Sequence, residues 1–310
     1  MKRASLSLNH QRKMINSEQH VTYKNNKFKH MKTTNHFFKG IIIACLLITV
    51  SIFSQEQLYI NVTTMHRNMN LEDFSMDEWK AVEVEYHEKV TMKNEYILSS
   101  TTLLHYFTSD NSEVVFITVY PSWTAIEEAT KRNEELEKEA WPDEATRKAF
   151  FKNQRTYYTN EHSDEIYITI PGVKALEETD LPLIYYVRTS YFAYPEDSDG
   201  AYNDEFMSML NEYNEAVTHK NDYYKGYYPQ VHFYGADRTE FVEVFVTETL
   251  AELERGISNQ GKLFRAHWEG NDRQKEYRMV MGKFLTGIHG DRIYSSVPEL
   301  NKSMNGDSEE

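Results

Sequence analysis

The stretch Glu85-Tyr-His-Glu-Lys-Val-Thr-Met-Lys-Asn94 occurs a second time as Glu212-Tyr-Asn-Glu-Ala-Val-Thr-His-Lys-Asn221. Seven of the ten positions are identical, and the two copies lie 127 residues apart. At this offset the two copies align without a gap from about residue 76 to residue 171 of the first copy, which excludes a chance match. It also relates His105 to His232, Trp141 to Trp268, His162 and Asp164 to His289 and Asp291, and Tyr167 to Tyr294. The sequence therefore predicts a tandem duplication.

The duplication sets the expected domain boundaries. We expect one repeat over residues 56–171, a linker over 172–182 and a second repeat over 183–298. Residues 299–310 are mostly polar, and a disordered tail is expected there.

Hydrophobic periodicity predicts the same elements in both repeats. Trp79, Val82, Tyr86 and Val90 recur at helical spacing, and the second copy keeps this apolar stripe. Runs with β-strand character cover residues 97–107, 113–120 and 165–170, and helical segments cover 123–139 and 142–157. With a first strand near residue 60, each repeat has the order β-α-β-β-α-α-β.

Without its extra helix, this order is the split β-α-β-β-α-β unit of ferredoxin-like folds. The duplicated pattern resembles the dimeric α+β-barrel superfamily. The resemblance implies an α+β fold in which the two repeats pack as an intramolecular barrel with helices outside, in a monomer with an internal pseudo-twofold axis. The superfamily includes small-molecule monooxygenases, lactone isomerases, haem peroxidases, haem-degrading enzymes and members without a known activity, so the fold does not select a function.

Composition excludes several classes of protein. The 310 residues carry a net charge of −14, with 40% hydrophobic and 26% charged residues, as in an ordinary folded protein. A nucleic-acid binder would need a basic face, so the acidic charge balance argues against that class of protein. The single cysteine rules out a disulfide framework within the chain and CxxC metal sites, and no nucleotide-binding or hydrolase motif occurs.

The N-terminus differs from the rest of the chain. Residues 1–39 contain nine Lys or Arg and one acid, and residues 40–53 are uncharged and mostly apolar. Fourteen residues are too few to span a bilayer core but suit a signal peptide, whose start we expect at Met31. We therefore expect residues 1–54 to be non-structural and the protein to be exported to the periplasm or outside the cell. The alternatives are an uncleaved membrane anchor over residues 40–53 or a lipidated Cys45, after which the apolar run continues for too long.

Strand parity predicts a candidate pocket between the two half-sheets. Val115, Ile117 and Val119 form an aliphatic face that we expect to meet the helices, as do their second-repeat counterparts. Polar and aromatic residues on the remaining parity would then line the space between the sheets, a reasonable site for a small molecule. These are His105, His232, Tyr59, Asn61, Tyr167, Tyr186, Arg188 and Tyr294. The alternative is that they fill the barrel and hydrogen-bond one another.

Two His-x-Asp pairs are weak candidates for metal ligation. His162 and Asp164, and likewise His289 and Asp291, point the same way if they lie in strands. The motif is short, so we favour a structural role and predict no metal site. A single histidine could ligate a haem axially, but no haem motif occurs, and the cofactor stays open.

Three functions remain. We favour an exported protein that binds a small molecule in or beside the barrel. One alternative is an enzyme of the superfamily, monooxygenase-like or haem-enzyme-like, that uses His and Tyr in acid–base chemistry. The other is a structural or interaction module of the cell envelope.

Overall fold

The computed structural model describes residues 57–196 and 204–304, and both halves of this region repeat one order of elements. The first half contains β1 (Tyr59–Arg67), α1 (Met76–Tyr86), a π-helix η1 (His87–Thr91), β2 (Ser99–Phe107), β3 (Glu113–Tyr120), α2 (Trp123–Ala140), α3 (Glu144–Thr156) and β4 (Tyr158–Thr169). The second contains β5 (Ile184–Phe192), α4 (Asp204–Tyr213), the π-helix η2 (Asn214–Thr218), β6 (Gly226–Tyr234), β7 (Glu240–Thr247), α5 (Leu250–His267), α6 (Asn271–Phe284) and β8 (Leu285–Ser296), followed by a 3-10 turn η3 (Pro298–Leu300). The predicted order is confirmed.

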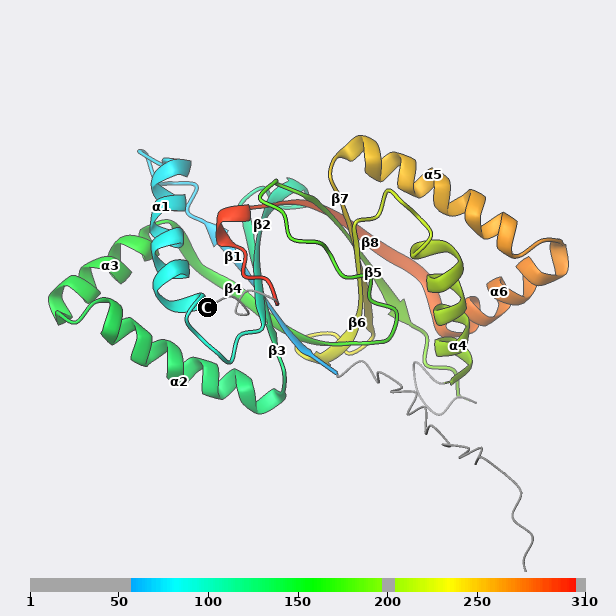
Figure 1. Ribbon diagram of the computed structural model, residues 1–310, viewed down its shortest axis with the longest axis horizontal. Helices are drawn as coiled ribbons and strands as arrows, with labels where there is room; N and C mark the ends of the chain where they lie inside the picture. Colours follow the sequence, from blue (N-terminus) through cyan, green and yellow to red (C-terminus); the bar gives the residue numbers. More distant parts are fainter. Residues whose placement is uncertain (1–56, 197–203, 305–310) are drawn as a thin grey trace, which may run out of the picture. The chain divides into compact units, whose positions relative to one another are not determined.

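The eight strands form one closed antiparallel barrel in the order β1-β3-β2-β8-β5-β7-β6-β4. Each half contributes a four-stranded ferredoxin-like sheet, and the halves join through β2–β8 and β4–β6. The helices of the first half cover one side of the barrel and those of the second half cover the other (Figure 1). The predicted intramolecular α+β barrel is therefore confirmed.

Local sequence signals explain where the helices begin. Ser75, Ser122, Asp143 and Thr249 each cap a helix with a side-chain oxygen that accepts a backbone N–H in the first turn. Tyr86 and Tyr213, which are 127 residues apart, each end a helix directly before a five-residue π-helix. They therefore occupy equivalent positions, as the duplication requires.

The barrel interior is packed with aliphatic and tyrosine side chains from both halves. Val115, Val242, Val244 and Val246 lie in one buried cluster with Tyr167 and Tyr294. Only the interior can bring together side chains from so many strands of both halves. The expectation that the valine face meets the helices is therefore wrong. Val114, Phe241 and Phe245, from the opposite faces of β3 and β7, pack under the helices instead.

The first strands of the two halves are related by 125 residues, not by 127. Ile60 pairs with Val119, and the residue that pairs with Val246 is Tyr185. The two offsets differ by two residues, so equivalent side chains still point to the same face of the sheet. Thr63 and Arg188 are consequently equivalent, each opposite the equivalent residue of the third strand, Phe116 or Glu243.

Two equivalent hydrogen bonds join the halves inside the barrel. The Tyr167 hydroxyl donates to Glu240 Oε2 at 2.5 Å, and the Tyr294 hydroxyl donates to Glu113 Oε2 at 3.2 Å. Each tyrosine comes from the last strand of its own half and each acid from the third strand of the other half. The pairs therefore obey the pseudo-twofold symmetry of the duplication.

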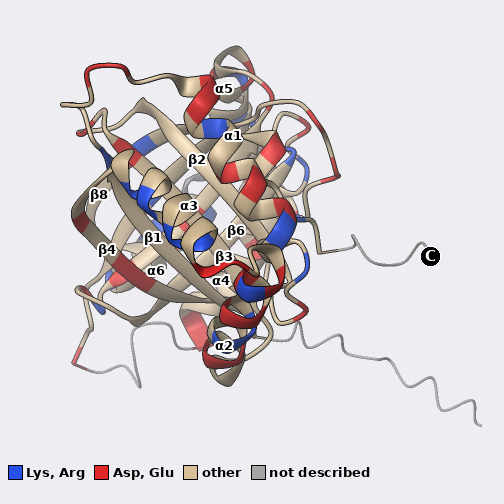
Figure 2. Ribbon diagram, turned by 90° about the vertical axis from the view of Figure 1, so that its left-hand side faces the viewer, with Lys and Arg blue, Asp and Glu red and all other residues tan. Residues whose placement is uncertain are grey.

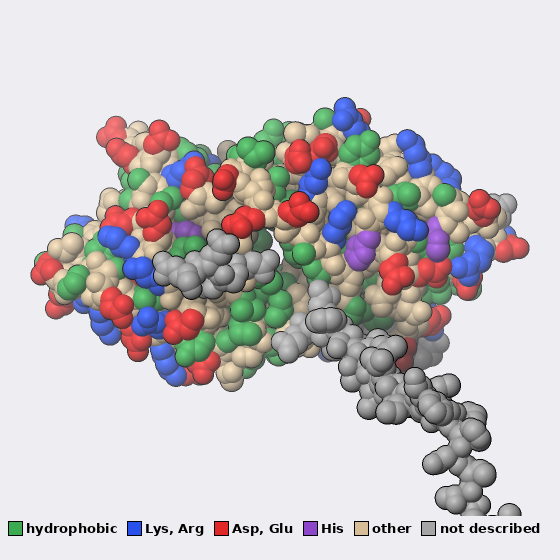
Figure 3. Space-filling view, viewed as in Figure 1, with side chains coloured by type: hydrophobic (Ala, Val, Ile, Leu, Met, Phe, Trp, Pro, Cys, Tyr) green, Lys and Arg blue, Asp and Glu red, His purple; other side chains and the backbone are tan. Residues whose placement is uncertain are grey.

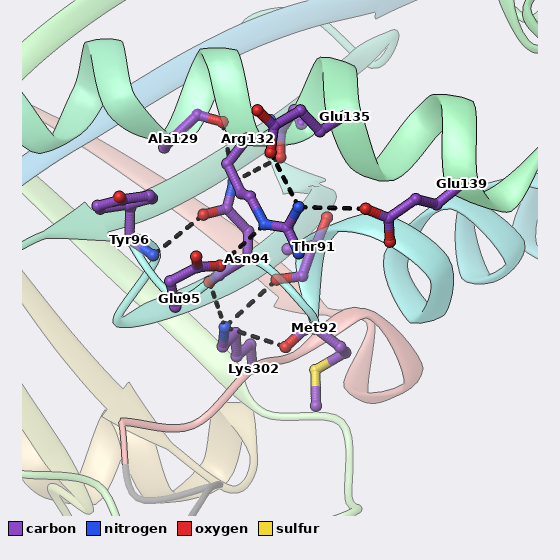
Figure 4. Close-up of polar contacts among 11 residues, drawn as sticks. Thr91, Met92, Asn94, Glu95, Tyr96, Ala129, Arg132, Glu135, Glu139 and Lys302 are labelled. Atoms are coloured by element: carbon purple, nitrogen blue, oxygen red, sulfur yellow. Dashed lines mark hydrogen bonds and ion pairs between the residues drawn. The ribbon is translucent and has the colours of Figure 1, made fainter.

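The expectation of a disordered tail from residue 299 is wrong for residues 299–304, because the segment Pro298–Lys302 packs against the first half. We call this segment the C-terminal strap. Lys302 is buried, exchanges two backbone hydrogen bonds with Ser100, and donates from Nζ to the carbonyls of Thr91, Met92 and Asn94 (Figure 4). Residues 305–310 lie outside the described part of the chain.

The predicted N-terminal segment also lies outside the described part of the chain, which begins at residue 57. Within residues 57–196 and 204–304, no helix is long and apolar enough to cross a membrane. Asp and Glu residues occur along the ribbons of α1 and α2 in Figure 2, and Figure 3 shows acidic and basic side chains interspersed on the face that it draws.

Candidate functional site

A cavity of about 370 Å³ lies in the first half, between the outer face of the sheet and the helices. The sheet contributes small polar residues, among them Thr63, Ser100, Thr102 and Thr118. Apolar and aromatic walls come from the strands, the helices and the C-terminal strap, namely Met65, Tyr86, Ile97, Phe116, Tyr120 and Leu300. This size and this mixture of surfaces are typical of a small-molecule site.

The polar centre of the cavity is Glu83, which α1 directs toward the sheet. Its side chain is buried, and one carboxyl oxygen accepts from the Tyr158 hydroxyl at 2.8 Å while the other accepts from Gln154 Nε2 at 3.1 Å. Trp79 Nε1 in turn donates to the Tyr158 oxygen at 2.8 Å. Burial raises the pKa of Glu83 to about 6, against the opposing effect of its two hydrogen bonds. A carboxyl with this pKa exchanges its proton near neutral pH.

The corresponding place in the second half is filled, because larger side chains occupy the same positions; a pocket of about 340 Å³ in that half lies elsewhere, against α5. Tyr227 stands where Ser100 stands in the first half, Phe245 where Thr118 stands, and Tyr224 where Ile97 stands. These three aromatic side chains are fully buried in one cluster with Leu253. The fold can therefore be packed without an opening at this place.

Glu83 and the residues that bond it are polar in the first half, whereas their counterparts in the second half are apolar. Glu83, Gln154 and Tyr158 correspond to Leu210, Met281 and Leu285, which belong to or pack against one apolar cluster. The fold therefore accepts an apolar set at these positions. The polar set of the first half is an addition that folding does not require.

The predicted pocket residues do not come together. His105, His232, Tyr167 and Tyr294 lie on the inner face of the barrel, whereas the other predicted residues lie on the outer face. The His232 side chain is buried, with its ring 6.1 Å from that of Tyr167, and its Nε2 lies 3.5 Å from Glu165 Oε2. His105 Nδ1 bonds Thr108 Oγ1 at 2.8 Å. Tyr167 and Tyr294 pack among aliphatic side chains of the interior, and their hydroxyls bond Glu240 and Glu113 rather than the other predicted residues.

Tyr59, Tyr186 and Arg188 point outward, toward the helices. Tyr59 contacts the ring of Phe233 at 5.1 Å in an exposed aromatic group. Arg188 donates to the Tyr186 hydroxyl at 2.9 Å, and that hydroxyl donates to Asp291 at 2.6 Å. Asn61 is on the same outer face and donates to Thr63 Oγ1 at 3.0 Å. The prediction of a single pocket lined by all these residues is therefore wrong.

The two His-x-Asp pairs lie on exposed parts of β4 and β8. His162 and Asp164 are 3.6 Å apart, and His289 and Asp291 are 3.0 Å apart. Asp164 also accepts from Thr63 Oγ1 at 2.5 Å. Within residues 57–196 and 204–304, no group of three or more His, Cys, Asp or Glu side chains is arranged to hold a metal ion.

The cavity does not fit an axially ligated haem. His87 is the one histidine among its lining residues, and its Nε2 contacts the carbonyl of Asn301 at 3.2 Å.

Sequence reasoning missed Glu83, Gln154 and Tyr158 because it searched for residues that both repeats retain. The useful signal was the opposite one. Three polar residues of the first repeat coincide with three apolar residues of the second, at positions that the helix and strand patterns place toward the core.

No protein-family model matches the chain, and no curated protein matches it in sequence. Solved structures do match. A candidate monooxygenase from Lactobacillus acidophilus NCFM has a TM-score of 0.50 at 8% identity, over 80% of this chain and 97% of that one. This likeness concerns the fold, a closed α+β barrel.

Two further matches are of the same kind. A candidate monooxygenase from Fusobacterium nucleatum subsp. nucleatum has a TM-score of 0.49 at 12% identity, over 77% of this chain and 92% of that one. A chlorite dismutase variant from Candidatus Nitrospira defluvii has a TM-score of 0.47 at 13% identity, over 78% and 92%. At such identities the likeness concerns the fold alone.

Proposed function

We propose that the protein binds a small molecule in the cavity of the first half. The observation that supports this is the comparison within the chain. One copy of the fold keeps an opening with a buried polar group at its centre, and the other copy closes the same place with Tyr224, Tyr227 and Phe245. An opening that the fold does not need costs packing energy, so a function explains why it is kept.

The test is to close the first cavity as the second half does. Thr118→Phe places in β3 the side chain that β7 carries as Phe245, and the fold accommodates it there. We expect small aromatic fragments, screened by ligand-observed NMR, to bind the wild-type protein and to lose binding in this variant. The melting temperature should be unchanged or higher, because the new ring fills empty space.

The matched control is Thr130→Phe, which adds the same ring at an exposed position of α2. This variant should bind the fragments like wild type. Fragment binding that survives in Thr118→Phe would place the ligand elsewhere and contradict the proposal.

Acid–base catalysis on the bound molecule is a second candidate. It is favoured by the Glu83 carboxyl, whose pKa of about 6 suits proton transfer near neutral pH, and by the hydroxyl of Tyr158 beside it. Bound fragments with acidic C–H bonds should then take up deuterium from D₂O with wild type and not with Glu83→Gln. Equal uptake by both proteins would exclude this role for Glu83.

Export is part of the proposal. It is supported by the basic segment 1–39 and the apolar segment 40–53. N-terminal sequencing of protein from the cell envelope or medium should begin near Gln55 or Glu56. Intact Met1 in the cytosol would contradict export, and intact protein in membranes would favour the anchored alternative.

A further inference from the structure

The buried carboxyl of Glu83 is unusual because no cation accompanies it. Its two hydrogen bonds come from Tyr158 and Gln154, which are both neutral donors. No ion pair joins Glu83 to a Lys, Arg or His side chain within residues 57–196 and 204–304. Buried carboxylates in folded proteins are normally paired with a positive charge.

In the second half a cation lies beside the buried carboxyl. Glu243 lies in the corresponding layer between sheet and helices, accepts from the Tyr227 hydroxyl at 2.8 Å, and is opposite Arg188 in the strand register, although the ion pair of Arg188 is with Asp291. The positive charge of Arg188 lowers the pKa of Glu243 against the larger, raising effect of burial. In the first half the residue equivalent to Arg188 is Thr63, which carries no charge. The sheet's Arg67 lies over the ring of Phe74, and no ion pair between it and Glu83 is among those of the described residues.

The other titratable groups around the cavity do not supply the missing charge. Tyr86, Tyr120 and Tyr158 have pKa values that burial raises, so all three are neutral. His87 is held neutral by burial, and its Nε2 contacts the carbonyl of Asn301. Arg155 lines the cavity from α3, but its side chain is exposed, and Glu137 of α2, which accepts from Tyr86, adds further negative charge.

Resting on the proposed function, we propose that the ligand is a small organic ammonium ion with a compact apolar body, whose nitrogen pairs with Glu83. The cavity has the size for such a molecule at about 370 Å³. The rings of Tyr86, Phe116 and Tyr158 around it attract cations through their π faces. Met65, Ile97 and Leu300 supply the surface for the apolar part.

The test uses three probes of the same shape and different charge on the full chain. These are 2-phenylethylamine, 2-phenylethanol and phenylacetate. We expect the amine to bind at least about tenfold more tightly than the alcohol at pH 7.5, and the anion to bind weakest, since a charged hydrogen-bonded pair is worth more than a neutral one. Between pH 7.5 and pH 5 the amine should lose about tenfold in affinity as Glu83 gains its proton, while the alcohol changes little.

Glu83→Gln keeps the shape and removes the charge. It should abolish the preference for the amine and the pH dependence together, while the alcohol binds as before. Glu83→Leu, which copies Leu210, is a second variant with the same expected loss of preference.

An alcohol or anion that binds as tightly as the amine would overturn the inference, as would an unchanged preference in both variants. Fragments that bind wild type but not Thr118→Phe, with no binding of the amine, would also overturn it and leave the proposed function standing. If no fragment binds wild type at all, both fail.

Discussion

At the scale of single residues, the exchange of Glu83 for Leu210 separates what the fold needs from what it does not. Both side chains are buried on the same face of equivalent helices, α1 and α4. Burial of Glu83 requires desolvation of a carboxyl, whereas burial of Leu210 does not. The first half therefore carries a group that lowers stability near neutral pH. Such a cost is typical of functional sites.

This cost has a predictable pH dependence. The pKa of Glu83 is raised from 4.5 to about 6, so the folded protein holds this proton more tightly than the unfolded chain does. The resulting stabilisation is complete below about pH 4.5 and is lost as the pH rises through 6, with a total of about 2 kcal/mol. Glu83→Gln does not titrate and lacks this effect.

The measurement is the free energy of unfolding of wild type and Glu83→Gln between pH 4 and pH 7.5. The stability of wild type relative to the variant should fall by about 2 kcal/mol over this range. Curves that stay parallel would show that the carboxyl is not perturbed by burial.

At the scale of elements, the C-terminal strap is a wall of the cavity. Leu300 lines the cavity, and Lys302 fixes the strap to the end of η1 by three hydrogen bonds from its ammonium group to backbone carbonyls. The second half repeats the device, since Lys174 pairs with Tyr227 as Lys302 pairs with Ser100, and donates to the carbonyls of His219 and Asn221. The predicted linker and tail thus both contain such a segment.

Lys302→Met should destabilise the protein by about 2–3 kcal/mol, because it leaves buried carbonyls without their charged donor. Lys131→Met, which removes an exposed i,i+4 ion pair on α2, should leave the stability nearly unchanged. Thermal and denaturant unfolding compare the two. Equal and small effects would mean that the strap does not depend on Lys302.

Elements were predictable to different degrees. Helices and the apolar strands followed from periodicity, but β4 and β8 are each several residues longer than the predicted strands 165–170 and 292–297. Their first halves are polar and exposed, and they are strands because their backbones pair with β1 and β5. The orientation of β3 and β7 was predicted wrongly because both faces of these strands carry apolar side chains, so alternation alone does not tell which face meets the helices.

At the scale of the whole molecule, the duplication and the resemblance to α+β barrels together predicted the barrel. The repeat fixed the element order, and the resemblance supplied the packing of one half-sheet against the other, although the faces assigned to that packing were the wrong ones. The site could not be predicted in this way, because it depends on three positions where the repeats differ, around Glu83, and on a cavity that only packing defines.

A barrel closed within one chain leaves no unpaired strand edge among β1 to β8. We therefore predict that the protein is a monomer, stabilised across its halves by the bonds from Tyr167 to Glu240 and from Tyr294 to Glu113. Light scattering coupled to gel filtration should give the mass of one chain at micromolar concentration. The mass of a dimer would contradict the prediction.

The central claim is that a ligand occupies the first half and not the second, and methionine methyl NMR tests it most directly. Met65 lines the cavity, whereas Met281 and Met209 lie in the apolar core at the corresponding side of the second half. On titration with the tightest-binding fragment, the account predicts that the Met65 methyl signal shifts and saturates while the signals of Met281 and Met209 stay in place. Saturable shifts of Met281 or Met209 with an unmoved Met65 would contradict it.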